Sequence, residues 1–504
     1  MSEPVSPAAR VARGATYIYL QTLLGNIFGV VYFAFATRFL TVYEVGVLSS
    51  LFLITTIFST FFSLSLPAAL TKFVPEFIGS GKADLARGVI KKGIISGLVV
   101  SIFSSSLCFL ASSLISSLLF GSLVYQYVLG VLALDVFAIM FSPFLGGALV
   151  GLQKFREVSI ANSLGYGIKY AIAIVLLHCG FGPLGVVLGW VMGDFSKIVV
   201  CTYFLASFRD GVASVPFSRM IKYSSPIYLA GFLSYLSARA DQFLIILYLG
   251  LKDLGIYNAA ITASWVVSSI SDSISSALFP QFAERFGRKD RKALLSASYG
   301  ASRYLSIIYL PLAVGLATVA LPTITLIAGT KYIEGTTPLA LFSLTSAIGC
   351  YGLIAYSIIA SLGKTNIFFW ASLLSFSIDA VSCLMLIPQL GIVGASIGRM
   401  LSDIVGFGFL MYNLKRILGW HFDRGALKKS WLNAAIMGLI VLVVQHFLVG
   451  RFYLPLYILI GGASYIVFMR LFRVMNKSDI ALLKDFLPKR LEFIADILGK
   501  LLVV

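Results

Sequence analysis

Apolar residues come in long runs along this chain, one run after another, from near its first residue to near its last. Each run is about 20 residues or longer, which is the length that a helix needs to cross a bilayer. Only helices satisfy their own backbone hydrogen bonds in lipid at this length, so every run is predicted to be helical. The fourteen predicted spans are residues 14–36, 44–66, 93–119, 124–148, 159–178, 184–206, 224–249, 256–280, 298–327, 336–360, 366–388, 392–414, 430–449 and 453–472.

The composition agrees with a membrane protein and excludes several other classes. Of the 504 residues, 59% are hydrophobic and 12% are charged, about half the charged share of a soluble domain. A soluble enzyme, a disordered chain and a disulfide scaffold are therefore excluded. The formal net charge of +18 would suit a nucleic-acid partner, but a chain of apolar spans is not a DNA-binding module. No nucleic-acid partner is expected.

Basic residues between the spans lie almost entirely on one side. Thirty Lys and Arg residues lie on the side of the N-terminus, whereas Arg38, Lys252, Lys331 and Arg451 lie on the other. Because cytoplasmic loops carry the excess of basic residues, we expect a multi-pass protein of the cell membrane with both termini in the cytoplasm. The positive charge then faces anionic lipids. The last part of the chain, 473–504, is predicted to form an amphipathic cytoplasmic tail at the membrane surface.

The sequence has an internal repeat, in which the second copy follows the first at an offset of 209 positions. Two blocks recur at this offset: an acid two residues before a glycine, and a series of glycines followed by an acid. The matched positions are Glu44 with Asp253, Gly46 with Gly255, Gly182 with Gly391, Gly185 with Gly394, Gly189 with Gly398, and Asp194 with Asp403. The offset carries the first span onto the seventh, so both copies enter the membrane in the same direction. Transporters often place a substrate path between such parallel repeats, which are related by an axis along the membrane normal.

The repeat predicts the domain organisation of an all-α fold. We expect two parallel six-helix lobes related by a pseudo-twofold axis, at 1–207 and 208–416, then two additional helices at 417–472 and the tail at 473–504. Small residues spaced three and four apart let helices approach closely, so the glycine series is assigned a packing role. Gly182 with Pro183, and the matching region of the second copy, are expected to form tight outer turns.

Ionisable residues inside the spans are costly in lipid and usually face a partner or a water-filled cavity. Candidate substrate-binding residues are the cations Lys169, Lys197, Arg239, Arg303 and Arg399, together with the polar Asn26. Two interpretations stay open. In one, Asp194 with Lys197 and Arg399 with Asp403 are structural pairs along a helix, and Arg303 extends to the membrane surface. In the other, the cations line a cavity and attract a phosphate-bearing substrate.

The acids inside the spans are candidates for coupling-ion or cavity-lining groups. They are Asp135, Asp194, Asp241, Asp272, Asp379 and Asp403. Asp135, Asp272 and Asp379 have no evident local partner, so each could hold a proton or a sodium ion, or pair across helices. No cluster has metal-ligand spacing, and no phosphate-binding loop or G-x-S-x-G nucleophile motif with triad partners is present. We therefore expect no metal, no cofactor apart from a coupling proton or sodium ion, and no enzymatic activity.

Two parts of the chain resemble Wzx-type polysaccharide exporters. The first runs Arg38-Phe-Leu-Thr-Val-Tyr-Glu-Val-Gly-Val-Leu-Ser-Ser-Leu and continues with Leu66-Pro-Ala-Ala-Leu-Thr-Lys-Phe-Val-Pro-Glu-Phe-Ile-Gly. The second runs Asp241-Gln-Phe-Leu-Ile-Ile-Leu-Tyr-Leu-Gly and continues with Leu254-Gly-Ile-Tyr-Asn-Ala-Ala. That family belongs to the multidrug/oligosaccharidyl-lipid/polysaccharide (MOP) exporter superfamily, for which two six-helix lobes plus a terminal helix pair are typical.

The resemblance implies a flippase that moves a polyprenyl-(pyro)phosphate-linked oligosaccharide from the cytoplasmic to the outer leaflet by alternating access. Its implied partners are this substrate, membrane lipids and enzymes of glycan biosynthesis. A second hypothesis is a cation-coupled multidrug exporter of the same superfamily, which would have an acid-rich cavity. A third is a membrane glycan-processing enzyme. The predicted outer loops, none longer than about ten residues, argue against this third hypothesis because they leave no domain for chemistry.

Overall fold

The computed structural model is all-helical in the part of the chain that it describes. This part comprises residues 7–208, 216–265, 267–268, 291–362, 364, 366–420 and 424–474. The predicted tail after residue 474 and residues 269–280 of the predicted eighth span lie outside it. The chain divides into two compact units, Met1–Asn258 and Ala259–Val504. This division reflects packing and does not test the repeat boundary predicted at 207/208.

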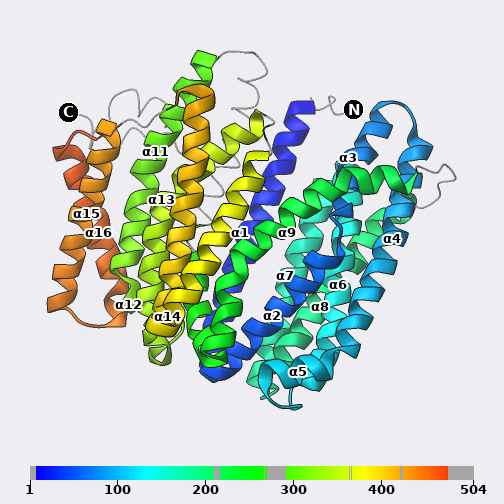
Figure 1. Cartoon of the computed structure of the whole chain (residues 1–504), viewed down its shortest axis with the longest axis horizontal. Coiled ribbons are helices and arrows are strands. Elements are labelled where there is room, and N and C mark those ends of the chain that lie inside the picture. The colour runs from blue at the N-terminus through cyan, green and yellow to red at the C-terminus, as the bar shows by residue number, and fades with distance from the viewer. Residues whose placement is uncertain are drawn as a thin grey trace, which may run out of the picture. The chain divides into compact units, whose positions relative to one another are not determined.

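The helices of the first unit follow one another with short connections. They are α1 (Pro7–Phe39), α2 (Val42–Phe62), α3 (Leu66–Gly79), α4 (Ala83–Leu110), α5 (Ser112–Phe120), α6 (Gln126–Gly151), α7 (Phe155–His178), α8 (Gly182–Leu205) and α9 (Phe217–Tyr248), and a further helical stretch begins at residue 251. Figure 1 shows α4, α6, α7 and α8 side by side. Thr41 and Glu44 start α2 with a capping box, in which the Glu44 N–H donates to Thr41 Oγ1 at 3.2 Å.

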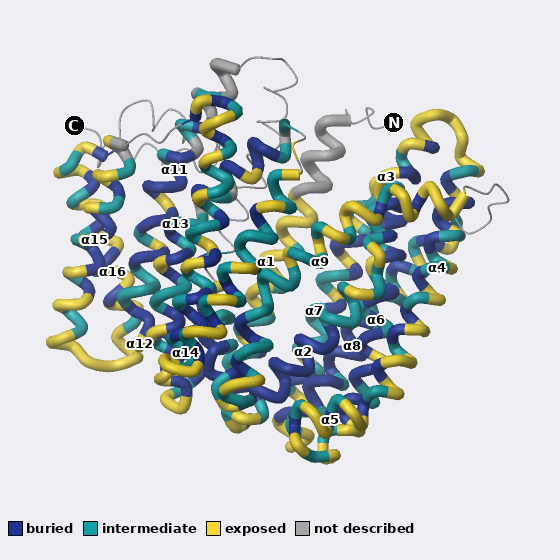
Figure 2. The backbone as a smooth tube through the Cα atoms, viewed as in Figure 1, coloured by how far each residue is buried: buried dark blue, intermediate teal, exposed yellow. Residues whose placement is uncertain are grey.

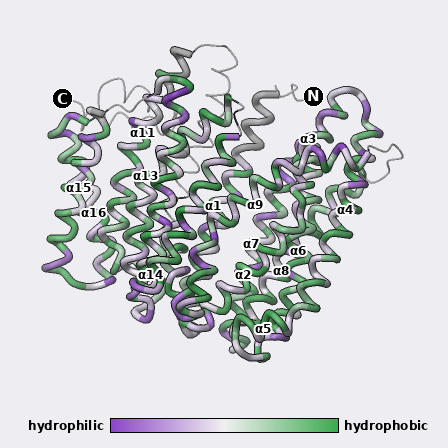
Figure 3. Tube along the Cα trace, in the orientation of Figure 1, coloured by the Kyte–Doolittle hydropathy of each residue, from purple (hydrophilic) through white to green (hydrophobic). Residues whose placement is uncertain are grey.

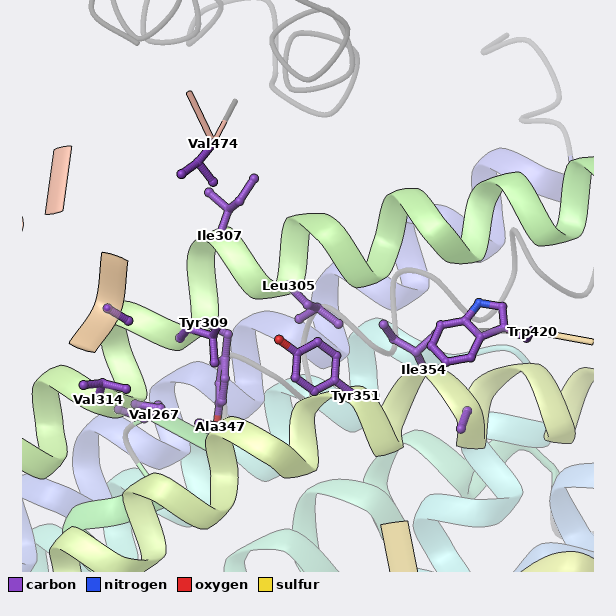
Figure 4. Close-up of a cluster of buried hydrophobic side chains, with 14 of the residues drawn as sticks. Val267, Leu305, Ile307, Tyr309, Val314, Ala347, Tyr351, Ile354, Trp420 and Val474 are labelled. Atoms are coloured by element: carbon purple, nitrogen blue, oxygen red, sulfur yellow. The ribbon is translucent and has the colours of Figure 1, made fainter. Parts of the chain in front are cut away.

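The helices of the second unit pack around a hydrophobic core. They are α11 (Arg291–Thr318), α12 (Ala320–Ile327), α13 (Thr336–Ser361), α14 (Asn366–Leu418), α15 (Arg424–Phe447) and α16 (Leu454–Leu471). In Figure 4, Tyr351 of α13 lies beside Leu305 of α11, and Ile307 points toward Val474. The hydroxyl of Tyr465 on α16 donates to the Ile307 carbonyl at 2.8 Å. The helices at 430–449 and 453–472 therefore pack onto α11.

One helix of the first unit was not predicted. α3 is 14 residues long, too short to cross a membrane, and it carries buried residues such as Leu66, Leu70 and Val74 on one face. These side chains join a core that also contains Phe144 of α6 and Met220 of α9. α3 therefore closes one end of the α4, α6 and α9 bundle.

The exposed side chains of the helices indicate whether lipid or water surrounds them. Large hydrophobic side chains stay exposed along both units, such as Leu110 at 76% and Phe447 at 77%, and Figures 2 and 3 show apolar residues on exposed faces. Patches of this extent suit lipid and not water. Within the described residues, ten helices are long and apolar enough to cross a membrane, or eleven if one bent pair is a single span. The protein is thus an all-α, multi-pass membrane protein, and the number of fourteen spans stays a prediction.

Two repeat-equivalent glycines make the same kind of turn. Gly182, between α7 and α8, has φ 56°, and Gly391, inside α14, has φ 58°, a left-handed conformation that glycine adopts without steric cost. Gly391 therefore divides α14 into two helices. They lie antiparallel, because Ser402 Oγ donates to the Ser375 carbonyl at 2.8 Å and Ser375 Oγ donates to the Ser402 carbonyl at 3.3 Å. The two predicted turns are present, and residues 366–388 and 392–414 lie in separate helices, as predicted.

Glycines also bring α7 and α8 close together. A Cβ built on Gly189 would lie 2.7 Å from the Lys169 carbonyl oxygen and 2.8 Å from the Ala173 nitrogen. A Cβ on Gly193 would lie 2.6 Å from the Gly165 carbonyl oxygen. Backbone atoms cannot move aside as a side-chain end can, so these positions require glycine. The predicted packing role of the glycine series is confirmed in the first copy.

A reciprocal contact joins the start of α2 to the stretch that begins at residue 251. A Cβ on Gly46 would overlap the Leu251 carbonyl, and a Cβ on Gly255 would lie 2.5 Å from the Val42 carbonyl oxygen. Residues 251 and 255 are the repeat equivalents of 42 and 46. Asn258 Nδ2 also donates to Ser49 Oγ at 2.6 Å, and these two residues are 209 positions apart. Such self-complementary contacts are those that a twofold axis produces where it passes between two copies.

Substitution of Gly189 tests the close packing of α7 and α8. We expect Gly189→Ala to lower the free energy of unfolding by about 1–3 kcal/mol, because its Cβ forces the two backbones apart. Gly167→Ala on α7 is the matched control, since a Cβ there meets nothing within 4 Å and alanine favours the helix. Unfolding of the purified protein in detergent, followed by circular dichroism, measures both. Equal stability of the two variants would show that the packing at Gly189 is not tight.

Candidate functional site

A charge network connects α7 and α8 in the first unit. Asp194 of α8, with its side chain 1% exposed, forms ion pairs with two lysines. Lys197 donates to Asp194 Oδ1 at 2.6 Å, and Lys169 of α7 donates to Oδ2 at 2.9 Å. The two lysine side chains are 12% and 13% exposed. The predicted pair of Asp194 with Lys197 is present, and a second cation shares the same carboxylate.

A third helix brings another acid to these charges. Asp135 of α6 is 1% exposed and interacts electrostatically with Lys169, Asp194 and Lys197. Both ammonium groups donate to Asp194, and the Oδ1 atom of Asp135 has no hydrogen-bond partner among the described residues. We call Asp135, Lys169, Asp194 and Lys197 the buried charge network.

Glycines and aromatic rings hold the two lysines. Lys197 lies across Gly165, where a Cβ would meet its side-chain carbons at 2.5 Å, and its Nζ lies 4.6 Å from the centre of the Tyr166 ring. Lys169 Nζ lies 5.3 Å from the centre of the Trp190 ring. An aromatic face attracts a cation through its quadrupole. Each ammonium group is therefore held between a carboxylate and a ring.

Arg239 of α9 continues this series of contacts. The Phe52 ring of α2 meets Trp190 edge-on, with centroids 6.2 Å apart, and the guanidinium carbon of Arg239 lies 5.6 Å from the centre of the Phe52 ring. Arg239 also donates to Gln242 Oε1 at 3.3 Å and is half-buried. The buried charge network together with Phe52, Tyr166, Trp190 and Arg239 is called the basic–aromatic site.

The basic–aromatic site has more cations than acids. Among its named members, Lys169, Lys197 and Arg239 are basic, whereas Asp135 and Asp194 are acidic. In a medium of low dielectric constant such an excess attracts an anion strongly. Arginine and lysine are the side chains that bind phosphate groups, arginine with two parallel hydrogen bonds.

Asp241 lies two residues from Arg239, and its carboxylate has other contacts. The Tyr257 hydroxyl donates to Asp241 Oδ2 at 2.6 Å, and the Gln242 N–H donates to Oδ1 at 2.8 Å. Asp241 is 1% exposed. Residues two apart on a helix point in different directions, as the sequence indicated for Arg239 and Asp241.

Asn26 on α1 lies outside the network of contacts described so far. Its side chain is exposed. One turn and a half earlier, Gln21 of α1 accepts a hydrogen bond from Asn162 of α7 at 3.1 Å. Tyr32 of α1 stacks on Tyr170 of α7 with ring centroids 5.0 Å apart. Polar and aromatic contacts thus attach α1 to α7.

The remaining candidate residues lie in the second unit or outside the described residues. Arg303 lies in the interior of α11 and donates to the Val474 carbonyl at 3.0 Å. Arg399 Nε lies 3.7 Å from Asp403 Oδ2, as the i, i+4 spacing predicts. Asp379 is fully buried, and Cys383 Sγ lies 3.6 Å from its Oδ1. Asp272 is not among the described residues.

Sequence reasoning missed the aromatic members of the basic–aromatic site. Phe52, Tyr166 and Trp190 lie in spans that are rich in aromatic residues, and nothing in their spacing relates them to the lysines. The sequence also contains no signal for the partner of Lys169, which lies 25 residues from Asp194 on another helix. The rotation of α7 relative to α8 decides this contact, and spacing along one helix cannot give it.

These features define a class, the multi-pass helical membrane proteins that bury charged side chains between their helices. A sequence model of the family described as "Polysaccharide biosynthesis protein" matches residues 35–337. This is more than half of the chain, and the chain belongs to this family. The resemblance to polysaccharide exporters is thereby confirmed.

Sequence relatives are distant. The uncharacterized membrane protein MJ1068 of Methanocaldococcus jannaschii is 25% identical over 236 residues, 44% of this chain and 45% of its own length. A second protein of that organism, MJ1375, is 24% identical over 81% of this chain and 98% of its own length. The teichuronic acid biosynthesis protein TuaB of Bacillus subtilis is 24% identical over 42% of this chain and 45% of its own length. The chain thus spans about half the length of two of these relatives and nearly all of the other.

Solved structures show the same fold. The lipid II flippase MurJ in an inward closed conformation has a TM-score of 0.73 at 18% identity and covers 90% of this chain and 98% of its own. An inward-facing multidrug resistance MATE family transporter of the MOP superfamily has a TM-score of 0.64 at 16% identity. The match covers 79% of this chain and 95% of the transporter chain. The predicted MOP-superfamily fold is confirmed by this similarity.

Loss of the shared carboxylate tests the buried charge network. We expect Asp194→Asn to lower the free energy of unfolding by about 3–5 kcal/mol, because it leaves two nearly buried ammonium groups without their partner. The matched control is Asp403→Asn at the repeat-equivalent position. It should cost less than about 1 kcal/mol, since that carboxylate is 47% exposed. Thermal unfolding in detergent measures both.

Removal of the cations separates charge from packing in this test. The triple variant Lys169→Met, Asp194→Asn, Lys197→Met has no buried charge in place of the ion pairs, so it should recover most of the lost stability. If it stays as unstable as Asp194→Asn alone, the carboxylate matters for packing and not for charge balance.

Proposed function

We propose that this protein is a flippase that moves a polyprenyl-(pyro)phosphate-linked oligosaccharide from the cytoplasmic to the outer leaflet of the cell membrane. We also propose that both termini lie in the cytoplasm. The observation that carries the proposal is the basic–aromatic site, an excess of positive charge among membrane helices, in a chain of the polysaccharide biosynthesis family. A lipid-linked sugar carries its negative charge on the phosphate groups, next to the membrane. Only a cationic group among the helices can stabilise those phosphates while they cross.

Arg239 is the proposed first phosphate ligand. Asp194 holds both lysine ammonium groups. Arg239 is half-buried, and its planar guanidinium group is suited to bind a phosphate with two parallel hydrogen bonds. Lys169 and Lys197 then attract the phosphate through their electric field. They touch it only if their ion pairs with Asp194 break. Arg303 and Arg399, which have structural contacts in the second unit, are secondary candidates, and so is the exposed Asn26.

The membrane potential favours the proposed direction. With the inside negative, each negative charge that moves outward gains about 2.3 kcal/mol per 100 mV. The empty, positively charged site is drawn back inward by the same field. The substrate leaves in the favourable direction even without a coupling ion, although a proton or sodium ion could add to the driving force.

Alternating access is proposed to use the reciprocal contact around Gly46 and Gly255. Because its contacts join repeat-equivalent residues, we propose that it lies on the pseudo-twofold axis between the six-helix lobes 1–207 and 208–416. In the predicted topology it lies at the outer ends of α2 and of the stretch from residue 251. The contact would then close the outer end of the substrate path in this conformation and separate when the path opens outward. Glycines on both sides allow this surface to close without side chains in between.

A cation-coupled multidrug exporter is the second candidate, favoured by the similarity in fold to a MATE family transporter. Such a protein needs a negative site for its cationic cargo. The excess of cations in the basic–aromatic site argues for an anionic cargo instead. Catalysis is not proposed, because a transporter fold with short outer loops offers no domain for it; enzymes of glycan biosynthesis are proposed as partners that supply the substrate.

Flipping by proteoliposomes tests the proposed function. A fluorescent polyprenyl-diphosphate-linked oligosaccharide is placed in one leaflet, and its protection from an external glycan-modifying reagent is followed over time. We expect Arg239→Ala to slow flipping by about tenfold or more, because a charged hydrogen bond to phosphate is lost. Arg451→Ala, an exposed arginine outside the site, is the matched control and should stay within about twofold of the unchanged protein.

A change of cargo separates the two candidates. If the unchanged protein flips no lipid-linked oligosaccharide but moves a cationic dye, the multidrug exporter replaces the flippase. If it flips the oligosaccharide and Arg239→Ala does so at the normal rate, the flippase stands and Arg239 is removed from the site.

A cross-link tests the role of the reciprocal contact. Ser49 and Asn258 touch through their side chains, so cysteines at both positions should come close enough to be cross-linked by oxidation. In a background in which the five native cysteines are replaced by serine or alanine, we expect oxidation of Ser49→Cys, Asn258→Cys to stop flipping and reduction to restore it. Each single cysteine variant is the control. Normal flipping by the fully cross-linked protein would show that this contact does not open.

A further inference from the structure

The function proposed so far leaves Asp135 without a role. It lies in the middle of α6, and every other charge that acts on it comes from a neighbouring helix: Lys169 from α7, and Asp194 and Lys197 from α8. A buried carboxylate without a donor of its own is costly, because it gives up its water and gains no hydrogen bond in return. The Oδ1 atom of Asp135 is such an atom. Its surroundings therefore favour a neutral carboxyl group.

The hydrogen bonds of Asp194 support the same conclusion. Asp194 accepts from Lys197 with one carboxylate oxygen and from Lys169 with the other. Both ammonium groups are therefore directed to Asp194 and not to Asp135. A neutral Asp135 carboxyl group brings its own O–H donor and adds no second anion to these helices.

Other charged and titratable groups lie on the helices around α6. On α4, Ser105 donates to the Ala133 carbonyl of α6, and Lys92 lies 13 residues before Ser105, about 20 Å along the helix. The helices that pack on α6 are α2, α3, α4, α5, α7 and α8. Besides Lys169, Asp194, Lys197 and Lys92, they carry Glu44 in the first turn of α2, Lys72 and Glu76 on α3, Asp84, Arg87 and Lys91 near the start of α4, and Arg156, Glu157 and His178 at the two ends of α7. α9, which packs on α2 and α3, adds Arg219, Lys222, Arg239 and Asp241.

We propose that Asp135 is a proton-binding site that sets the charge of the buried charge network. With the proton bound, the network carries Lys169, Lys197 and Asp194 in charged form, a net charge of +1. When the proton leaves, Asp135 becomes an anion and the network is neutral. The atoms balance, since the proton passes between the Asp135 carboxyl group and water. Protonation and the binding of an anion next to the network therefore favour each other.

We also predict that the flipping rate depends on pH, a prediction that rests on the proposed function. The protonated network is the form that attracts a phosphate group, so flipping should decrease as pH rises and Asp135 loses its proton. A neutral asparagine imitates the protonated carboxyl group at every pH. Asp135→Asn should therefore keep its flipping rate where the unchanged protein loses it.

Infrared difference spectroscopy tests the proton site without any transport. The purified protein is titrated from acidic to alkaline pH, and the C=O stretching band of protonated carboxyl groups is followed. We expect a buried carboxyl band that persists at neutral pH and disappears at alkaline pH. It should be lost in Asp135→Asn, shifted but present in Asp135→Glu, and unchanged in Asp403→Asn. A band that stays unchanged in a folded Asp135→Asn variant would overturn the proposal, and so would the absence of any such band in the unchanged protein.

The flipping assay provides the second measurement. The rate is measured in proteoliposomes with equal pH on both sides, over the pH range in which the infrared band disappears. Loss of the pH dependence in Asp135→Asn, with its retention in Asp403→Asn, is the expected result. A pH dependence that Asp135→Asn retains in full would overturn the link to transport. Absence of flipping in the unchanged protein would overturn the proposed function, while the infrared result would still decide the proton site.

Discussion

The charge balance at Asp194 is the constraint on which the first unit depends. Two lysines inside membrane helices can stay ionised only if an anion lies in contact with them, because lipid offers no water to solvate them. That contact requires α7 and α8 to approach until Lys169 reaches the carboxylate of Asp194 at 2.9 Å. The glycines of α8 permit the approach. A bulkier residue at Gly189 or Gly193 would separate the charges as well as the helices, so packing and electrostatics impose the same geometry.

Much of the fold follows from the sequence, because lipid leaves a chain few choices. Length of the apolar runs predicts helices, and the 209-residue offset predicts turns at Gly182 and Gly391, which both have left-handed φ values near 57°. α3 could not be predicted in this way. Its 14 residues are too few for a span, and its burial depends on side chains that three other helices contribute. A short helix of this kind becomes visible only when its partners are placed.

The site could be predicted only as far as single helices determine it. The spacing of Asp194 and Lys197 gives their ion pair, since residues three apart share a helix face. The partners Lys169 and Asp135 come from other helices, and the rotation of each helix about its axis decides whether they meet. The same limit applies to Arg303, whose partner is the carbonyl of Val474. Hydropathy gives the existence of each span but says little about which side faces a neighbour.

Comparison of the two copies separates what packing requires from what function requires. The glycines recur at the 209-residue offset, and in the second copy a Cβ on Gly398 would again clash, there with Cys383. The lysines do not recur: the equivalents of Lys169 and Lys197 are Ile378 and Gly406. Asp403, the equivalent of Asp194, pairs with Arg399 instead, at the position that Trp190 occupies in the first copy. The glycine packing thus exists in both copies, with the lysines in the first copy and without them in the second. Packing of the two helices therefore does not require the lysines, and what they add to the first copy is two positive charges beside one carboxylate.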